Sequence, residues 1–322
     1  MTRLRAHTRG VAAAVALATA MLGLTGCVGP VTTGNERFEI AGGGTTGVYY
    51  AYGEELAGAL HRELGIDIAV EETHGSVDNL LRVAAGEALL GFAQGDTAAD
   101  AVRGDGYFAE PLPVRAAARV YDEYVHLVVP AESEVRRIAD LEGRRVSLGA
   151  PNSGVQVIAT RVLASSDVAT GRIENPELGL DASIEAMQRG EIDAFFWVGG
   201  LPTPGIERLA EAMPIRLLSI EADTVDRVNE GHAGVYRLAD FPVGVYGIET
   251  PAVTMTVPNY LIASEDAPEE LIYDVVRVLF DSRQTIGRRV AAGEFLDRRQ
   301  AIFTAPVELH PGAERYYVDA RR

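Results

Sequence analysis

Three glycines near the start of the chain, Gly42, Gly44 and Gly47, have a spacing that could bring backbone N–H groups close to an anion. They lie between a predicted strand, Phe38–Ala41, and a predicted helix that runs to about Glu63. The first N–H groups of a helix have no partner inside it, and glycines let a ligand approach the main chain closely. The loop is therefore predicted to hold a carboxylate or a phosphate.

The same three glycines also fit the G-x-G-x-x-G spacing of a dinucleotide-binding loop. Two acids, Glu71 and Glu72, follow a predicted strand at Ile66–Val70, close to where such folds place the acid that binds a ribose. The loop alone thus leaves two functions open. One is the capture of a small anionic solute, and the other is an enzyme that uses a dinucleotide such as NAD.

If the loop binds a solute, its neighbours should supply further contacts. The backbone of Gly44–Gly47 would hold the carboxylate, and Thr45 and Thr46 would add neutral hydroxyl donors. Tyr49 and Tyr50 point in different directions on the predicted helix, so only one of them can face the ligand. We expect that residue to be Tyr49.

Three polar residues further along the first half of the chain are also candidates. Ser76 is a predicted helix N-cap, and Asn79 lies three residues later, on the same face of that helix. Gln94 follows a predicted strand, Leu89–Ala93. Because ligands of open α/β sheets bind at the carboxyl ends of the strands, we expect Gln94 to contact the solute.

The second half of the chain repeats part of this pattern. Three residues recur 107 positions later, Gly42, Gly47 and Val48 matching Gly149, Gly154 and Val155. Asn152, Ser153 and Gly154 are therefore predicted to form a second ligand-binding loop. A second predicted strand leads to Phe196, Trp197 and Gly199, which we expect to form the opposite wall of the site.

The N-terminus has the features of an exported protein. Arginines occupy positions 3, 5 and 9, and Val11–Leu22 is an apolar run of signal-peptide length, too short to span a membrane. The run closes on Leu24-Thr-Gly-Cys27, which resembles the bacterial lipobox, and Cys27 is the only cysteine of the chain. Residues 1–27 are thus predicted to be a lipoprotein signal peptide, Cys27 the lipidated residue, and 28–36 a tether to the outer face of the membrane.

The charge of the chain narrows the range of partners. The formal net charge is −17, and it becomes −20 without residues 1–27, which hold three arginines and no acid. So acidic a chain is not expected to bind nucleic acid, which needs a positive field. All basic residues are arginine, so chemistry that requires a lysine, such as a Schiff base or a Walker A loop, is excluded.

Catalytic patterns are missing from the sequence. It contains no G-x-S-x-G elbow, no H-E-x-x-H and no paired Cys/His spacing. The histidines downstream of residue 27 are scattered, at positions 61, 74, 126, 232 and 310. We therefore expect no catalytic residues, no metal and no cofactor, and we rank solute binding above an exported NAD-type enzyme.

The order of predicted elements indicates an α/β fold of two lobes with mostly parallel sheets. Two apolar, β-rich runs, Tyr124–Val129 and Val253–Ile262, are predicted to be hinge strands that cross between the lobes. The predicted boundaries place 37–123 and 260–322 in lobe 1 and 124–259 in lobe 2. Two lobes that each present a helix N-terminus would close on a ligand between them.

Several blocks, in collinear order over about residues 36–320, resemble the TAXI family of solute-binding proteins, which serve TRAP transporters. Besides the glycine loop, they are Thr73–Leu80, Gly86–Asp96, Leu141–Gly149, Pro151–Gly154, Asp193–Pro202 and His310–Tyr317. The resemblance implies a periplasmic-binding-protein-like clamshell that captures a glutamate-like or dicarboxylate solute for a TRAP-type membrane permease. The segment Phe241–Tyr246 departs from the family pattern, with valines where more polar residues are expected.

Overall fold

The computed structural model describes residues 38–232 and 234–321. The predicted signal peptide at 1–27, including Cys27, and the predicted tether at 28–36 lie outside the described residues. None of the described helices is long and apolar enough to cross a membrane.

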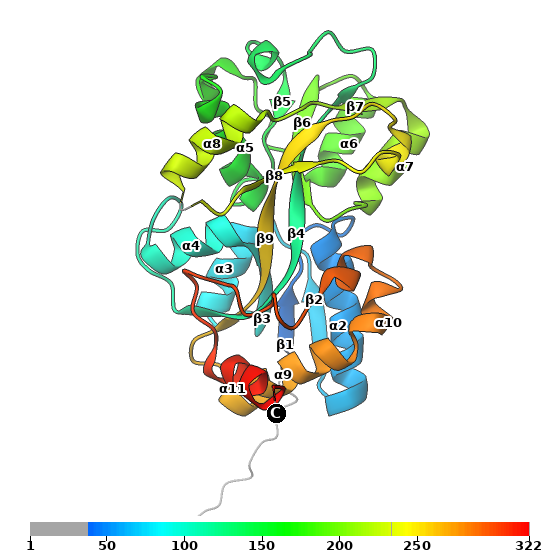
Figure 1. The fold of residues 1–322 in the computed structure, drawn as a ribbon. Coiled ribbons are helices and arrows are strands. Elements are labelled where there is room, and N and C mark those ends of the chain that lie inside the picture. The colour runs from blue at the N-terminus through cyan, green and yellow to red at the C-terminus, as the bar shows by residue number, and fades with distance from the viewer. Residues whose placement is uncertain (1–37, 233, 322) are drawn as a thin grey trace, which may run out of the picture. The chain divides into compact units, whose positions relative to one another are not determined.

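Helices and strands alternate along most of the chain (Figure 1). The strands are β1 (Phe38–Ala41), β2 (Ile68–Glu71), β3 (Leu90–Gln94), β4 (Val114–Pro130), β5 (Val146–Ser147), β6 (Ala194–Gly199), β7 (Ile215–Leu217), β8 (Arg237–Asp240) and β9 (Val253–Ser264). The α-helices are α2 (Val48–Leu64), α3 (Ser76–Ala84), α4 (Gly95–Arg103), α5 (Gly154–Ser165), α6 (Leu180–Gln188), α7 (Pro204–Ala212), α8 (Ala222–Gly231), α9 (Glu269–Asp281), α10 (Arg283–Gly287) and α11 (Pro311–Asp319). Short 3-10 helices cover Ile138–Leu141, Thr170–Arg172, Val245–Gly247 and Ala291–Phe295.

One sheet runs through the described residues, with the strand order β2-β1-β3-β9-β4-β6-β5, while β7 pairs with β4 and β8 pairs with β9. The long strands β4 and β9 lie antiparallel, in a register that extends from Val114 opposite Ser264 to Tyr124 opposite Thr256. Figure 1 shows the pair passing through the middle of the fold, from one group of helices to the other. Both predicted crossing strands are therefore present, and β4 begins ten residues earlier than predicted.

The pairing of the strands differs from the prediction in one respect. Neighbouring strands of the βα units pair in parallel, as expected: β1 with β2, β1 with β3, and β5 with β6. The pairs that involve β4 or β9 are all antiparallel. The sheet is mixed rather than mostly parallel, because each crossing strand runs opposite to the strands that it joins.

Two of the apolar cores lie at opposite ends of the crossing strands. One core joins α2 to α9 and β3, and it includes the fully buried Tyr52, Leu56, Leu60 and Phe92. The three residues on α2 recur every four positions, which places them on one face of the helix. A second core packs α5 and α8 onto β4 and β6. The two lobes are thus built as predicted, and the residues at which they divide remain a prediction.

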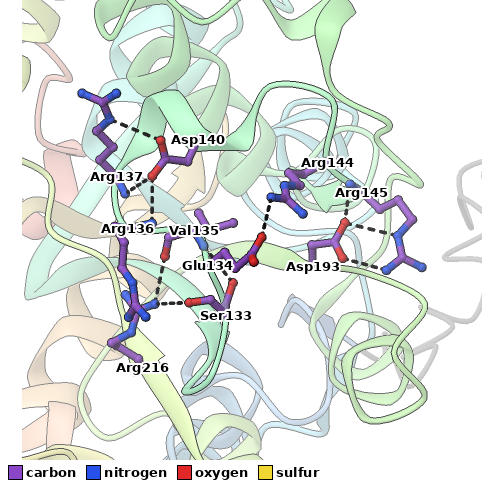
Figure 2. Close-up of polar contacts among 10 residues, drawn as sticks. All are labelled: Ser133, Glu134, Val135, Arg136, Arg137, Asp140, Arg144, Arg145, Asp193 and Arg216. Carbon is purple, nitrogen blue, oxygen red and sulfur yellow. Dashed lines mark hydrogen bonds and ion pairs between the residues drawn. The ribbon is translucent and has the colours of Figure 1, made fainter.

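Arginines at the far end of lobe 2 hold its loops in place (Figure 2). Arg145, beside β5, forms a two-pronged ion pair with Asp193, which precedes β6, with N–O distances of 2.7 and 3.2 Å. Arg216 of β7 donates to the carbonyl oxygens of Ser133 and Val135, at 3.2 and 2.8 Å. Arg145 and Arg216 therefore contact residues of their own lobe, and neither lines the cavity between the lobes.

Candidate functional site

A cavity of about 420 Å³ lies between the lobes and is lined by residues of both. Five helices begin at its wall, and each contributes its N-cap residue to the lining: Gly47 (α2), Gly75 (α3), Gln94 (α4), Ser153 (α5) and Gly179 (α6). The N-terminus of a helix carries about half a positive charge on its unpaired N–H groups. The helix N-termini on the wall therefore attract negative charge with main-chain groups alone.

Glycine is required where the walls come closest. Gly75 has a φ of +111°, which L side chains rarely adopt. At Gly154 the backbone of lobe 2 approaches lobe 1 so closely that a Cβ would lie 2.1 Å from Oε1 of Gln94 and 2.7 Å from Oγ of Ser76. The glycine at the start of α5 thus lets the two lobes meet.

The first glycine loop is held in shape by its own hydrogen bonds. The N–H of Gly43 donates to Oγ1 of Thr73 at 2.8 Å, and the N–H of Gly47 donates to the carbonyl oxygen of Gly44 at 2.9 Å. The positive φ of the loop, +67°, falls on Gly43, while a Cβ on Gly44 would have no heavy atom within 4 Å. Gly44 therefore leaves the wall open, and the turn itself depends on Gly43.

The floor of the cavity is a polar network around Glu123, a residue of β4 with no exposed surface. One carboxyl oxygen accepts a hydrogen bond from the hydroxyl of Tyr49 at 3.0 Å, and the other accepts from Tyr121 at 3.3 Å. The Tyr49 hydroxyl also lies 3.3 Å from Oγ of Ser76 and accepts from the side-chain amide of Asn259 at 2.5 Å. The network connects α2, α3, β4 and β9.

Burial dominates the electrostatics of this floor. It raises the pKa of Glu123 to about 8, although the tyrosine hydroxyls and the Gln94 and Asn259 amides favour the ionised form. Burial and the neighbouring Glu123 raise the pKa values of Tyr49 and Tyr121 well above the ordinary value of a tyrosine. The other acids on the lining are Glu72, Glu177 and Asp181, and none of the described arginines contributes to it.

Ten of the fourteen residues predicted to bind the ligand line this cavity. They are Gly44, Gly47, Tyr49, Ser76, Gln94, Ser153, Gly154, Phe196, Trp197 and Gly199. Of the two neighbouring tyrosines, Tyr49 is the one on the lining. The structure thus brings the two predicted loops and the predicted wall together, and their contact with a ligand remains a prediction.

The other four predicted residues are not on the lining. Thr45 is exposed, and the Thr46 hydroxyl donates to Asp181 at 2.5 Å. Asn79 is buried behind the wall, where it accepts from Thr73 and donates to a carbonyl of β3. Asn152 presents its backbone carbonyl to the N–H of Asp78, at 3.1 Å across the lobes.

Glu123 and Asp181 line the cavity and were not predicted from the sequence. A signal for Glu123 does exist. It alternates with Tyr121 and Val125 along a strand, and both of these neighbours are buried. Because residues two apart share a face of a strand, an acid between two apolar residues of this kind indicates a buried carboxyl. Nothing in the local sequence marks Asp181 in the same way.

A buried ionic cluster also joins the lobes, beside the cavity. Arg161 of α5 lies 2.6 Å from Asp96 and pairs with Asp100, both on α4. The hydroxyl of Tyr236, from lobe 2, donates to Asp96 at 2.6 Å. Within the described residues no group of three or more His, Cys, Asp or Glu side chains could hold a metal ion.

Comparisons with known proteins agree with this architecture. The sequence profile of the NMT1-like family matches residues 40–320. PhnD1 from Prochlorococcus marinus, solved in complex with methylphosphonate, superposes with a TM-score of 0.53 and 11% identity, over 89% of this chain and 96% of that one. MatC from Rhodopseudomonas palustris, solved with bound malate, gives a TM-score of 0.53 and 15% identity, over 88% and 95% of the two chains. At this identity the likeness shows the fold, and it confirms the predicted two-lobe α/β class.

Proposed function

The chain belongs to the NMT1-like family, and we propose that it is the extracytoplasmic solute receptor of a TRAP-type transporter. The observation that carries this proposal is the cavity between two lobes at which five helices begin. Such a site can bind a small solute by closing around it. The blocks that resemble the TAXI family support the TRAP type of transporter.

The solute in this proposal is a small organic acid, of the glutamate-like or dicarboxylate class. Its carboxylate would lie at the N-termini of α2 and α5, with the hydroxyls of Ser76 and Ser153 as further polar contacts. The two structures of this fold named above hold malate and methylphosphonate, which are also small anions. The partner of the closed, loaded receptor would be the membrane permease.

A thermal-shift screen of amino acids and organic acids on the protein from residue 28 onward tests this function. A ligand at a hundredfold excess over its Kd adds about 2.7 kcal/mol of stability. We expect at least one compound of these classes to raise the melting temperature, bind one to one and be recovered unchanged. Saturable NAD binding or chemical turnover would instead favour the alternative, an exported dinucleotide-binding enzyme that uses Gly42, Gly44 and Gly47.

A matched pair of variants places the binding in the cavity. Gly44→Val adds a side chain to the wall without a clash, because nothing lies within 4 Å of its Cβ position. Gly171→Val has equally open surroundings, outside the cavity lining. We expect Gly44→Val to lose the thermal shift and Gly171→Val to keep it. Equal shifts in both would place the solute elsewhere.

A further inference from the structure

The cavity holds a buried acid without a cationic partner among the described residues that surround it. Glu123 is fully buried, and its carboxyl oxygens contact the neutral hydroxyls of Tyr49 and Tyr121. None of the described arginines lines the cavity, and the histidine on the lining, His74, is exposed. A buried carboxylate is costly unless a cation or a proton neutralises it.

A second polar atom on the floor also lacks a partner. Oε1 of Gln94 is buried and accepts no hydrogen bond, and Gln94 lines the same cavity as Glu123. Glutamine oxygens accept hydrogen bonds and cannot donate them. The floor therefore offers acceptors, while the helix N-termini on the walls offer donors.

We propose that Glu123 and Gln94 bind a protonated amine of the solute, whose carboxylate lies at the helix N-termini. This inference rests on the proposed receptor function and narrows it. The site would take zwitterions and discriminate against plain carboxylic acids of the same skeleton. The other acids on the lining, Glu72, Glu177 and Asp181, add negative potential that favours an ammonium group and opposes a second carboxylate.

The opposite arrangement is chemically possible and gives the opposite pH dependence. In it, Glu123 keeps its proton and donates it to a second carboxylate of the solute. Since burial raises the pKa of Glu123 to about 8, the empty site holds that proton at neutral pH. An ammonium group would expel the proton on binding, whereas a carboxylate would retain it. The other titratable groups that face this space are Tyr49, Tyr121, Glu72, His74, Glu177 and Asp181.

Isothermal titration calorimetry with matched pairs of compounds tests the inference. The pairs are glutamate with glutarate, aspartate with succinate, and leucine with 4-methylpentanoate, each differing by the amine. We expect the amine-bearing member of at least one pair to bind at least about tenfold more tightly. Its binding should release close to one proton at neutral pH, measured in buffers of different ionisation enthalpy. Its affinity should rise nearly tenfold per pH unit up to about pH 8.

Glu123→Gln should weaken the amine-bearing compound by at least about tenfold and change its deaminated partner by less than about threefold. In this variant the affinity for the amine-bearing compound should no longer depend on pH. Gln94→Met should weaken the amine-bearing compound by a smaller factor, and His74→Gln should leave the proton release unchanged. Asp122→Asn, at the exposed neighbour of Glu123 that pairs with Arg119, is the matched control and should bind as the wild type does.

The outcomes separate this inference from the function on which it rests. If solutes bind but glutarate or succinate binds as tightly as its amino acid, with no proton released, Glu123 does not hold an amine and the receptor function stands. Retention of amino-acid affinity in Glu123→Gln, with an unchanged melting profile, leads to the same conclusion. If the folded wild-type protein binds no compound of any pair, both the inference and the proposed solute class are wrong.

Discussion

Arg161 and Asp96 form a buried ion pair between the two lobes, with an N–O distance of 2.6 Å and side chains that are 10% and 1% exposed. Arg161 comes from α5, whose N-terminus lines the cavity, and Asp96 comes from α4, directly after β3. The hydroxyl of Tyr236 completes the contact by donating to the same carboxyl oxygen of Asp96. The pair therefore joins the elements that have to meet when the lobes close.

We predict that Asp96→Asn weakens solute binding through closure. The substitution leaves Arg161 with one carboxylate partner across the lobes, Asp100, instead of two, and Arg161 regains solvent when the lobes separate. The open form should gain population, and the apparent affinity falls by the lost fraction of closed protein. We expect a loss of about tenfold or more, which is about 1.4 kcal/mol.

Titration calorimetry gives the affinity, and small-angle scattering with and without solute gives the population of open protein. Arg189→Met is the matched control, because Arg189 pairs with Glu185 and Glu191 on the exposed surface of lobe 2. That variant should bind as the wild type does. An Asp96→Asn protein with wild-type affinity and an unchanged radius of gyration would show that the pair does not govern closure.

A second prediction concerns Glu123 and the pH dependence of stability. Its pKa is raised from 4.5 to about 8 in the folded protein. Between these values the unfolded chain releases the proton and the folded protein keeps it, so the free energy of unfolding falls as the pH rises. The full stability is present below pH 4.5 and is lost as the pH rises toward 8, by about 1.4 kcal/mol per unit at most.

Glu123→Gln has no such proton, so its stability relative to the wild type should increase between about pH 5 and pH 8. Urea unfolding of both proteins across this range measures the difference. His126, whose pKa burial lowers to about 4, produces a slope of opposite sign below pH 6.5, and it cancels because both proteins contain it. A constant difference across the range would show that Glu123 is already ionised in the fold.

The third prediction uses the close approach of the lobes at Gly154. A methyl group there would lie 2.1 Å from Oε1 of Gln94, and Gln94 belongs to the other lobe. Gly154→Ala should therefore leave each lobe folded and hold the lobes apart, with a loss of solute affinity of about tenfold or more. Scattering should report a larger radius of gyration in the presence of solute than the wild type has. Normal closure of Gly154→Ala would contradict the approach described here.

The sequence predicted the fold well where a local pattern determines the structure. The glycine loop, α2 and the two crossing strands follow from glycine spacing, helical period and β-rich runs, and they lie where expected except that β4 begins ten residues earlier. The antiparallel direction of the crossing strands was not predicted. Alternating strands and helices predict parallel neighbours within a lobe, and they give no information on a strand that passes from one lobe to the other. Strand direction there is set by tertiary pairing.

The candidate site was also predicted well only where a local sequence pattern determines the structure. Main-chain positions such as Gly47 and Gly154 line the cavity, because the start of a helix fixes where its N–H groups lie. Side chains such as those of Thr46 and Asn79 form hydrogen bonds within the protein, with Asp181 and Thr73, and no local sequence pattern predicts these contacts. Glu123 was missed because its role depends on a tyrosine 74 residues away in the chain.

The last prediction concerns the residue that would attach the receptor to the membrane. Cys27 is the only cysteine of the chain, and it ends an apolar run that follows three arginines. We predict that it carries the lipid, which would hold the domain at the outer face of the membrane through residues 28–36. Because a lipid chain binds by the burial of its CH₂ groups, at about 0.8 kcal/mol each, its loss should release the protein. Cys27→Ser should therefore move the protein from the membrane fraction to the soluble fraction of the cell envelope, and mass spectrometry should find no lipid on it. Ser166→Ala, a substitution 139 positions later in the sequence, is the control and should stay with the membrane. If Cys27→Ser remains in the membrane fraction, the chain is retained there by something other than this cysteine.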